Sequence, residues 1–249
     1  MTTLALHCIK GGVGKTTTAV NLAYLASLSR GPCLLCDLDP QGGASYYLRI
    51  RADKGYGAKK LLRGGKHTEA EIKATHFAHF DLLPSAFSYR KLDVRLDRGK
   101  RPRRRLAEIL EPLGRNYRTL IIDSPPGIGL ASEAILRAAD LVLCPLIPSP
   151  LSMQSHETLV GFMGRRKSGM PPVLAFFCLT DRRRSLHRQT VEDNAGTPGF
   201  LRSVIPYSSE VERSGLERVP ICAHHPTSPP AMAYEALWRE CLEVLDAES

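Results

Sequence analysis

The 249-residue sequence lacks the features of a membrane-spanning or exported protein. It contains no run of about 18 consecutive apolar residues, so we expect no transmembrane helix. A strand is expected from Thr3, almost at the first residue, which leaves no room for a signal peptide. The same early strand leaves no room for an N-terminal helix-turn-helix. We therefore expect a cytoplasmic protein without operator-specific autoregulation.

Paired cysteines are also missing. The seven cysteines are scattered, and an odd number of them favours reduced, buried thiols in a cytosolic protein. Cys33 and Cys36 have C-x-x-C spacing, but residues three apart in one strand point to opposite faces. Because no second ligand pair exists, we expect no zinc site here.

No long linker, repeat or low-complexity segment divides the chain, so we expect a single domain over residues 1–249. With 43% hydrophobic residues, a chain of this length can form one large core. The expected strands are Thr3–Ile9, Cys33–Leu38, Phe80–Pro84, Tyr117–Asp123, Leu141–Leu146, Val173–Leu179 and Ser203–Ile205. The expected helices include Thr16–Ser29, Ser132–Ala139, Ser152–Arg166 and Ala231–Leu245. This alternation predicts an α/β fold, a mostly parallel twisted sheet with helices on both faces.

The most informative motif is the octet Lys10–Thr17, which fits the phosphate-loop pattern G-x-x-x-x-G-K-[ST] without its first glycine. Glycines let the backbone fold around a phosphate chain with its N–H groups pointing at the anion. Lys15 supplies a charge for the β- and γ-phosphates, and Thr16 supplies a hydroxyl for Mg²⁺. The residues expected to bind the nucleotide are Gly11, Gly12, Val13, Gly14, Lys15, Thr16 and Thr17.

A second lysine, Lys10, begins this loop. Two lysines on one triphosphate make geometric sense if one of them reaches a nucleotide held by another subunit. We therefore count both Lys10 and Lys15 as candidate catalytic residues.

Carboxylates end two further apolar strands. The segment Leu34–Gly42 contains Asp37 and Asp39, which alternation along a strand would place on one face, toward the phosphates. One would lie near the metal and the other near the attacking water. Asp123 ends the other strand, at the edge where open α/β sheets bind ligands. For Asp37 and Asp39 the alternative is a turn-forming role before Pro40.

With these motifs the chain resembles the ParA/MinD group of deviant-Walker ATPases, and within it the ParA-like cargo-positioning proteins, over nearly its whole length. The resemblance is carried by Lys10–Thr17, Asp37–Gly42, Ile122–Pro126 and Val204–Pro206. It implies a P-loop NTPase fold, slow ATP hydrolysis with Mg²⁺, and an ATP-dependent homodimer in which Lys10 crosses to the partner's nucleotide. It also implies an adaptor protein that stimulates hydrolysis.

The resemblance further implies roles for individual residues. Asp39 would polarise the hydrolytic water, Asp37 and Asp123 would support Mg²⁺ with Thr16, and the segment around Pro206 would lie against the adenine. The segments Asp39–Tyr47 and Arg182–Arg184 look more like the McdA branch, which positions carboxysomes, than like plasmid partition proteins.

Acidic residues are in the minority, with 25 Asp and Glu against 34 Lys and Arg and a net charge of +9. The cations gather in runs with no acidic counterpart nearby, which favours a polyanion surface. We expect non-specific, salt-sensitive binding to nucleoid DNA, because no recognition helix or stacking pattern is evident. The candidate DNA-binding residues are Arg103, Arg104, Arg105, Arg182, Arg183, Arg184 and Arg188. A solvated approach to a helix is the alternative for Arg98–Arg105, and Arg165–Lys167 is better explained as complementing a helix C-terminus.

The main rival function is a MinD-like ATPase that cycles on membranes through a basic amphipathic C-terminal helix. The last expected helix has an apolar stripe, but its polar side carries four acidic residues against Arg239, so an anionic membrane would repel it. The stripe is predicted to pack on the domain instead. An ATP-locked scaffold is disfavoured by Asp39, and an iron–sulfur relative by the scattered cysteines. No motif names the cargo, which leaves a carboxysome, a chromosome or plasmid, or another complex open.

Overall fold

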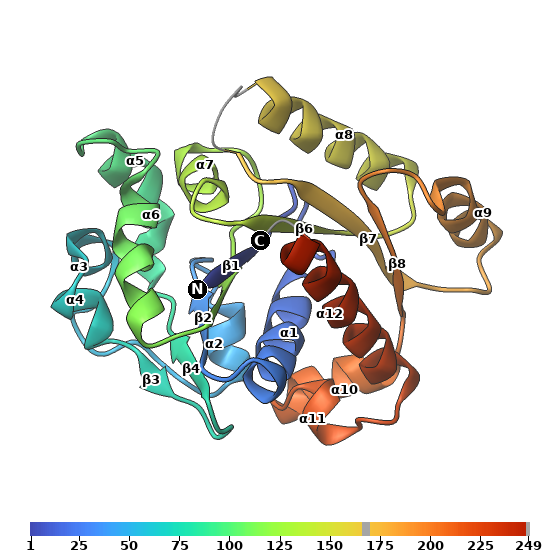
Figure 1. Cartoon of the computed structure of the whole chain (residues 1–249), viewed down its shortest axis with the longest axis horizontal. Helices are drawn as coiled ribbons and strands as arrows, with labels where there is room; N and C mark the ends of the chain where they lie inside the picture. Colours follow the sequence, from blue (N-terminus) through green and yellow to red (C-terminus); the bar gives the residue numbers. More distant parts are fainter. Residues whose placement is uncertain (166–169, 248–249) are drawn as a thin grey trace.

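The computed structural model describes residues 1–165 and 170–247, and within them eight strands form one sheet (Figure 1). The sheet order is β3-β4-β2-β5-β1-β6-β7-β8, and every pairing is parallel except that of β3 with β4. The strands are β1 Thr2–Leu6, β2 Cys33–Asp37, β3 Lys73–Ala74, β4 Phe80–Leu83, β5 Thr119–Asp123, β6 Leu141–Leu146, β7 Val173–Thr180 and β8 Phe200–Pro206. The predicted fold class is confirmed.

Helices cover both faces of the sheet. One face is packed by α1 Lys15–Ser29, α2 Gly43–Tyr47, α10 Ser209–Glu217, α11 Ile221–His224 and α12 Pro229–Ala247. The other is packed by α3 Ala58–Arg63, α5 Leu92–Asp97, α6 Arg105–Leu110, α7 Leu130–Leu136, α8 Pro150–Arg165 and α9 Ser185–Asn194. The short elements α4 Lys66–Glu69, η1 Phe87–Lys91 and η2 Glu111–Arg115 complete the second side.

Strand alternation divides the side chains between two apolar cores. In β2, Cys33 and Leu35 join the core with α1, whereas Leu34 and Cys36 join the core with α6 and α7. The two cysteines of the C-x-x-C pair therefore point to opposite faces, as predicted. Because the central strands are apolar on both sides, both faces of the sheet must be covered by helices.

The predicted strands occur near the expected positions but with different ends. The first strand stops at Leu6 rather than Ile9, because the following residues turn into the phosphate loop. The last is longer than predicted and runs from Phe200 to Pro206. Arg166 and Lys167 of the basic run at the end of α8 lie outside the described residues.

The C-terminal helix α12 packs on the fold through its apolar stripe. Tyr234, Leu237 and Trp238 are buried, and the Trp238 indole donates to the Ser29 hydroxyl of α1 at 2.9 Å. On its other side, Glu240 accepts hydrogen bonds from the N–H of Arg202 and from the Ser203 hydroxyl, both in β8. The prediction that the stripe packs on the protein is confirmed. In the described part of the chain, no helix combines the length and apolarity needed to span a bilayer.

Candidate nucleotide site

The phosphate loop joins the central strand β1 to the N-terminus of α1. Gly12 and Gly14 have φ of 74° and 93°, a backbone conformation that favours glycine. A Cβ at Gly14 would also lie only 2.8 Å from the Cys178 sulfur. Helix α1 has no side-chain cap and no acidic residue in its first turn, so its free N–H groups can meet an anion.

The two lysines of the loop take different positions. Lys15 is buried, and its Nζ donates to the backbone carbonyl of Lys10 at 3.2 Å. Its side chain therefore runs back along the loop. Lys10 is partly exposed and does not line the adjoining cavity, which Lys15 does line.

A cavity of about 510 Å³ opens beside the loop. Its phosphate end is lined by Gly11, Gly12, Gly14, Lys15, Thr16, Thr17, Asp39, Gln41 and Pro126. Of the expected nucleotide contacts, Val13 turns its side chain into the core, so only its backbone can serve a ligand. The volume is within the range of small-molecule sites.

Two carboxylates lie side by side at the ends of β2 and β5, where Asp37 and Asp123 are register partners. Neither residue is exposed to solvent. Asp37 accepts from the N–H and the hydroxyl of Ser45 at 2.8 and 2.7 Å, and Asp123 accepts from the Thr16 hydroxyl at 2.7 Å. Burial raises the pKa of Asp37 to about 6. Burial, followed by the charge of Asp37, raises the pKa of Asp123 well above its usual value.

This pair fits the Mg²⁺ that the resemblance implies. The Oδ1 atoms of Asp37 and Asp123 are buried and have no hydrogen-bond partner among the described residues. With the Thr16 hydroxyl they form the hard oxygen donor set that Mg²⁺ prefers, and a divalent cation would offset their mutual repulsion.

Asp39 lies in a turn rather than in a strand. Because β2 ends at Asp37, strand alternation does not place Asp39, and the argument that both share one strand face is wrong. Asp39 accepts from the Gln41 N–H through its carboxylate and from the Gly42 N–H through its carbonyl, both at 2.9 Å. It lines the cavity all the same. Asp39 therefore both forms the turn and lies at the site.

The far end of the cavity could not be predicted from any motif in the sequence. That end is lined by Tyr47, Leu179, Val211, Glu212 and Gly215. These residue types are common in any core or helix surface. Pro206 ends β8, just before α10, which supplies three of the lining residues.

His7 was also missed. It is buried directly before the loop, and its Nδ1 lies 2.7 Å from the Ser124 hydroxyl. Burial, with the charge of Lys15 as the second cause, lowers the pKa of His7 to about 4. The imidazole is therefore neutral at physiological pH and links β1 to the segment after Asp123. The signal in the sequence was that His7 is a polar residue within the predicted apolar strand Thr3–Ile9.

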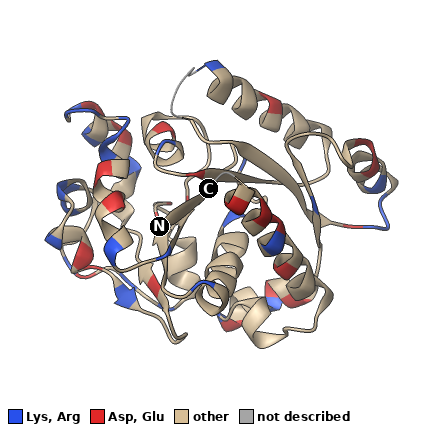
Figure 2. Cartoon of the chain, in the orientation of Figure 1, with Lys and Arg blue, Asp and Glu red and all other residues tan. Residues whose placement is uncertain are grey.

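The arginine runs lie far apart in the fold and are partly neutralised (Figure 2). Arg103 contacts the buried Glu133 of α7 at 3.0 Å, and Arg105 contacts Glu108 at 3.5 Å. Arg183 makes a two-pronged ion pair with Asp181 at 2.9 and 3.0 Å.

The expectation of no acidic counterpart nearby is therefore wrong. Glu108 and Asp181 lie within three residues of the arginines they bind, and folding brings Glu133 of α7 beside Arg103. Arg104, Arg182, Arg184 and Arg188 are exposed, and none of them makes an ion pair within the described residues.

The comparisons with known proteins agree with this geometry. The AAA domain family matches residues 1–173. A chromosome partitioning protein ParA from Myxococcus xanthus is 30% identical over 241 residues, covering 94% of this chain and 85% of the relative.

Two solved structures share the fold. A cobyrinic acid a,c-diamide synthase from Mycobacterium smegmatis with bound ADP and magnesium has a TM-score of 0.82 at 24% identity, covering 100% of this chain and 97% of that one. An ATP complex of a Cyanothece McdA variant has a TM-score of 0.82 at 21% identity, covering 98% and 96%.

The buried pair predicts a pH-dependent stability. Because folding raises the pKa of Asp37, the protonated carboxyl stabilises the fold fully below the unfolded pKa of 3.8. This contribution is lost as pH rises through the folded pKa of about 6. The shift of about two units corresponds to at most about 3 kcal/mol. Without nucleotide, Asp37→Asn should therefore be more stable than the parent by up to this amount at about pH 7.5, and nearly equal to it at about pH 4.

Urea unfolding at both pH values measures this difference, with the exposed Asp97→Asn as the control. An Asp37→Asn protein no more stable than the parent at the higher pH would show that the pair is not strained.

Proposed function

The chain belongs to the ParA-like P-loop ATPases of the AAA domain family, and on that premise we propose that it forms an ATP-dependent dimer, binds nucleoid DNA without sequence preference, and positions or partitions an intracellular cargo. It is an ATP hydrolase, with ATP and Mg²⁺ as its cofactors. The observation that carries the dimer is the division of the two lysines, since Lys15 lines the cavity and Lys10 does not. We place the protein in the cytoplasm, associated with the nucleoid and regulated by an adaptor protein.

The site residues divide the work of hydrolysis among them. The loop N–H groups and the N-terminus of α1 bind the phosphates, and Lys15 turns from the Lys10 carbonyl to the β- and γ-phosphates. Thr16, Asp37 and Asp123 would hold Mg²⁺, which would supply the charge that neutralises the phosphates. Asp39, in its turn at the cavity wall, orients the attacking water.

Partition of a chromosome or plasmid is the cargo role supported by the relatives, and a carboxysome cargo rests only on the resemblance of two segments to the McdA branch. The MinD-like alternative requires a C-terminal helix free to lie on a membrane. In this chain the apolar stripe of α12 packs against α1, and Glu240 on its other side accepts a hydrogen bond from Ser203 of β8.

Lys10→Ala should bind ATP almost as well as the parent but fail to form the ATP dimer, because Lys15 remains in the same-subunit site. Light scattering with ATP and Mg²⁺ measures the dimer, and a fluorescent ATP analogue measures binding. Lys15→Ala is the matched control and should lose binding itself. Dimerisation of Lys10→Ala with ATP would disprove the cross-subunit role.

Asp39→Ala should bind ATP and accumulate as the dimer, because its loss removes the group that orients water but none of the phosphate contacts. Single-turnover phosphate release should slow by about 100-fold or more, in line with the loss of a general base. The Asp39→Asn variant keeps the turn, so it separates the two roles of this residue. Parent-like phosphate release by Asp39→Asn would reduce Asp39 to a turn residue.

The unpaired arginines beside α9 should bind DNA more strongly than the paired ones. Arg182→Ala with Arg184→Ala should weaken binding to unrelated duplexes equally, and each lost phosphate contact should reduce the slope of log K against log salt by about 0.9. Arg183→Ala is the matched control, since its guanidinium is engaged by Asp181. Filter binding across a salt series measures both. An equal loss of slope per arginine removed in the two proteins would show that ion pairing does not decide which arginines bind DNA.

A further inference from the structure

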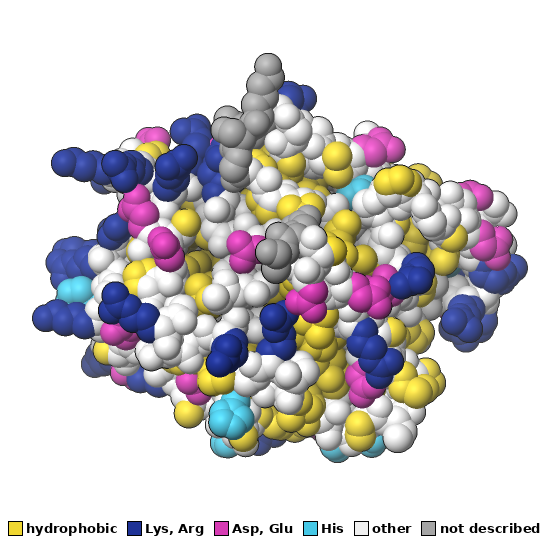
Figure 3. All heavy atoms as spheres, viewed as in Figure 1, with side chains coloured by type: hydrophobic (Ala, Val, Ile, Leu, Met, Phe, Trp, Pro, Cys, Tyr) yellow, Lys and Arg dark blue, Asp and Glu magenta, His cyan; other side chains and the backbone are white. Residues whose placement is uncertain are grey.

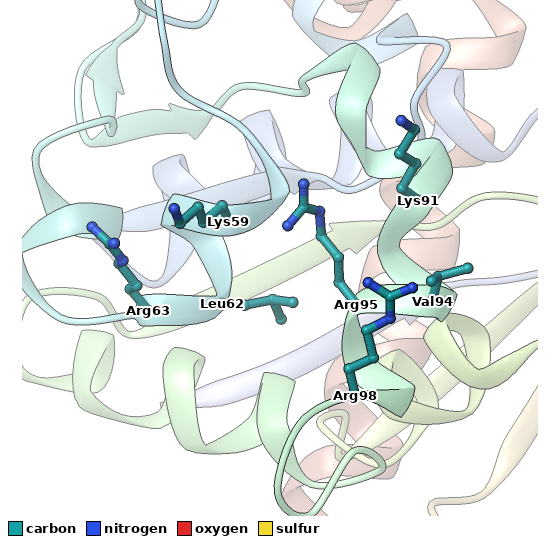
Figure 4. Close-up of a pocket in the computed structure, with 7 residues that line it drawn as sticks. All are labelled: Lys59, Leu62, Arg63, Lys91, Val94, Arg95 and Arg98. Atoms are coloured by element: carbon teal, nitrogen blue, oxygen red, sulfur yellow. The ribbon is translucent and has the colours of Figure 1, made fainter.

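A second cavity, of about 670 Å³, lies between α3 and the segment η1–α5, on the face of the sheet opposite α1 (Figure 4). Its rim is cationic. Two cations come from α3 and three from η1, α5 and the residue after α5: Lys59, Arg63, Lys91, Arg95 and Arg98. Figure 4 shows Arg95 lying between the two helices, with Lys59 and Arg63 across from it. We call this hollow the basic groove.

The basic groove also has an apolar strip. Leu62 and Val94 complete its lining, and Val94 is 54% exposed. More than half of the Val94 residue is thus left exposed among the cations of the rim. The strip is therefore available to an apolar side chain from outside.

No acidic residue lines the basic groove. None of its five cations makes an ion pair with another described residue. This distinguishes them from Arg103, Arg105 and Arg183. Figure 3 shows the same side of the molecule crowded with Lys and Arg.

The groove continues into a hollow of about 400 Å³ that shares Leu62 and Arg95 and adds Lys100 and Arg101. The one acid there, Glu108, is engaged by Arg101 at 3.6 Å and by Arg105 at 3.5 Å. The positive lining is thus extended, which suits a linear anionic chain better than a single small anion.

The walls of the groove connect to the nucleotide site. The Asp93 carboxylate of α5 accepts the N–H of Ala131, in the helix that follows the Asp123 strand and its loop, at 2.7 Å. Ser85, just before η1, donates its hydroxyl to the carbonyl of Asp39, and its N–H donates to the Ser45 hydroxyl at 2.8 Å. Ser45 in turn holds Asp37. A ligand that shifts η1 or α5 would therefore move groups bonded to the catalytic turn and to the metal site.

We propose that the basic groove binds an acidic segment of a partner protein, one in which Asp or Glu flank an apolar side chain, and that its binding alters ATP turnover. The cations match the carboxylates, and Leu62 with Val94 receives the apolar residue. A DNA duplex presents its phosphates on a convex surface and has no use for the apolar strip. The effect on turnover rests on the proposed function, whereas the binding does not.

The binding test uses a fluorescent 12-residue peptide of Glu and Asp with two Leu, followed by anisotropy at low salt without nucleotide. Lys59→Glu with Arg95→Glu should weaken peptide binding by about tenfold or more, a loss of about 1.4 kcal/mol. Arg182→Glu with Arg184→Glu changes net charge equally and should leave binding within about twofold of the parent. Replacing both Leu by Ser in the peptide, or Val94 by Ser in the protein, should weaken binding by a smaller factor of about three.

Failure of the parent to bind the peptide, or equal binding by the groove variant and the parent, would overturn the proposal. A groove variant that loses binding to a duplex but keeps peptide binding would make the groove a nucleic-acid surface instead. Saturating peptide should change the parent's ATP turnover by at least about twofold and leave that of the groove variant unmoved. An unchanged parent rate would overturn the regulatory half. A parent that hydrolyses no ATP would instead overturn the proposed function and leave the anisotropy result standing.

Discussion

The burial of two neighbouring carboxylates is the constraint on which the site depends. Asp37 and Asp123 end adjacent strands in the middle of the sheet and are fully removed from water. Such a pair is costly to keep ionised without a cation, and the raised pKa of each carboxyl reflects that cost. The fold limits the cost by giving each one a donor, Ser45 for Asp37 and Thr16 for Asp123. The other oxygen of each carboxylate has no hydrogen-bond partner among the described residues, so both would be available to a bound metal ion.

Neighbouring elements are arranged around this pair. Gly43 begins α2 so close to Thr16 that an added Cβ would lie 3.0 Å from its methyl group and 3.1 Å from its hydroxyl. A larger residue would therefore push on the group that bonds Asp123. The parallel sheet brings the carboxyl ends of β1, β2 and β5 to one edge, so the loop, the Asp39 turn and the Asp123 segment meet without any long excursion of the chain.

The sequence was sufficient for the parts of the fold that follow a strong period or a glycine motif. The long central strands, α1, α8, α12 and the phosphate loop were predicted because apolar runs and the Lys10–Thr17 spacing carry them. The six-residue helices α3 and α5 were not located because fewer than two turns give no readable periodicity, and α6 was expected only as the helix that follows Arg98–Arg105. The far end of the cavity was missed because Val211 and Gly215 become neighbours of the loop only after α10 folds against it.

The arginine runs show most clearly what could not be predicted from the sequence. A run of arginines in the sequence says how many cations are present but not which acids fold against them. Arg103 is matched by Glu133, 30 positions along the chain, whereas Arg95 in the basic groove makes no ion pair with any described residue. Like charges held together at a rim repel one another, and an oppositely charged chain relieves that repulsion. Unmatched charge in the folded protein, rather than charge density in the sequence, is therefore the better guide to where this molecule binds an anion.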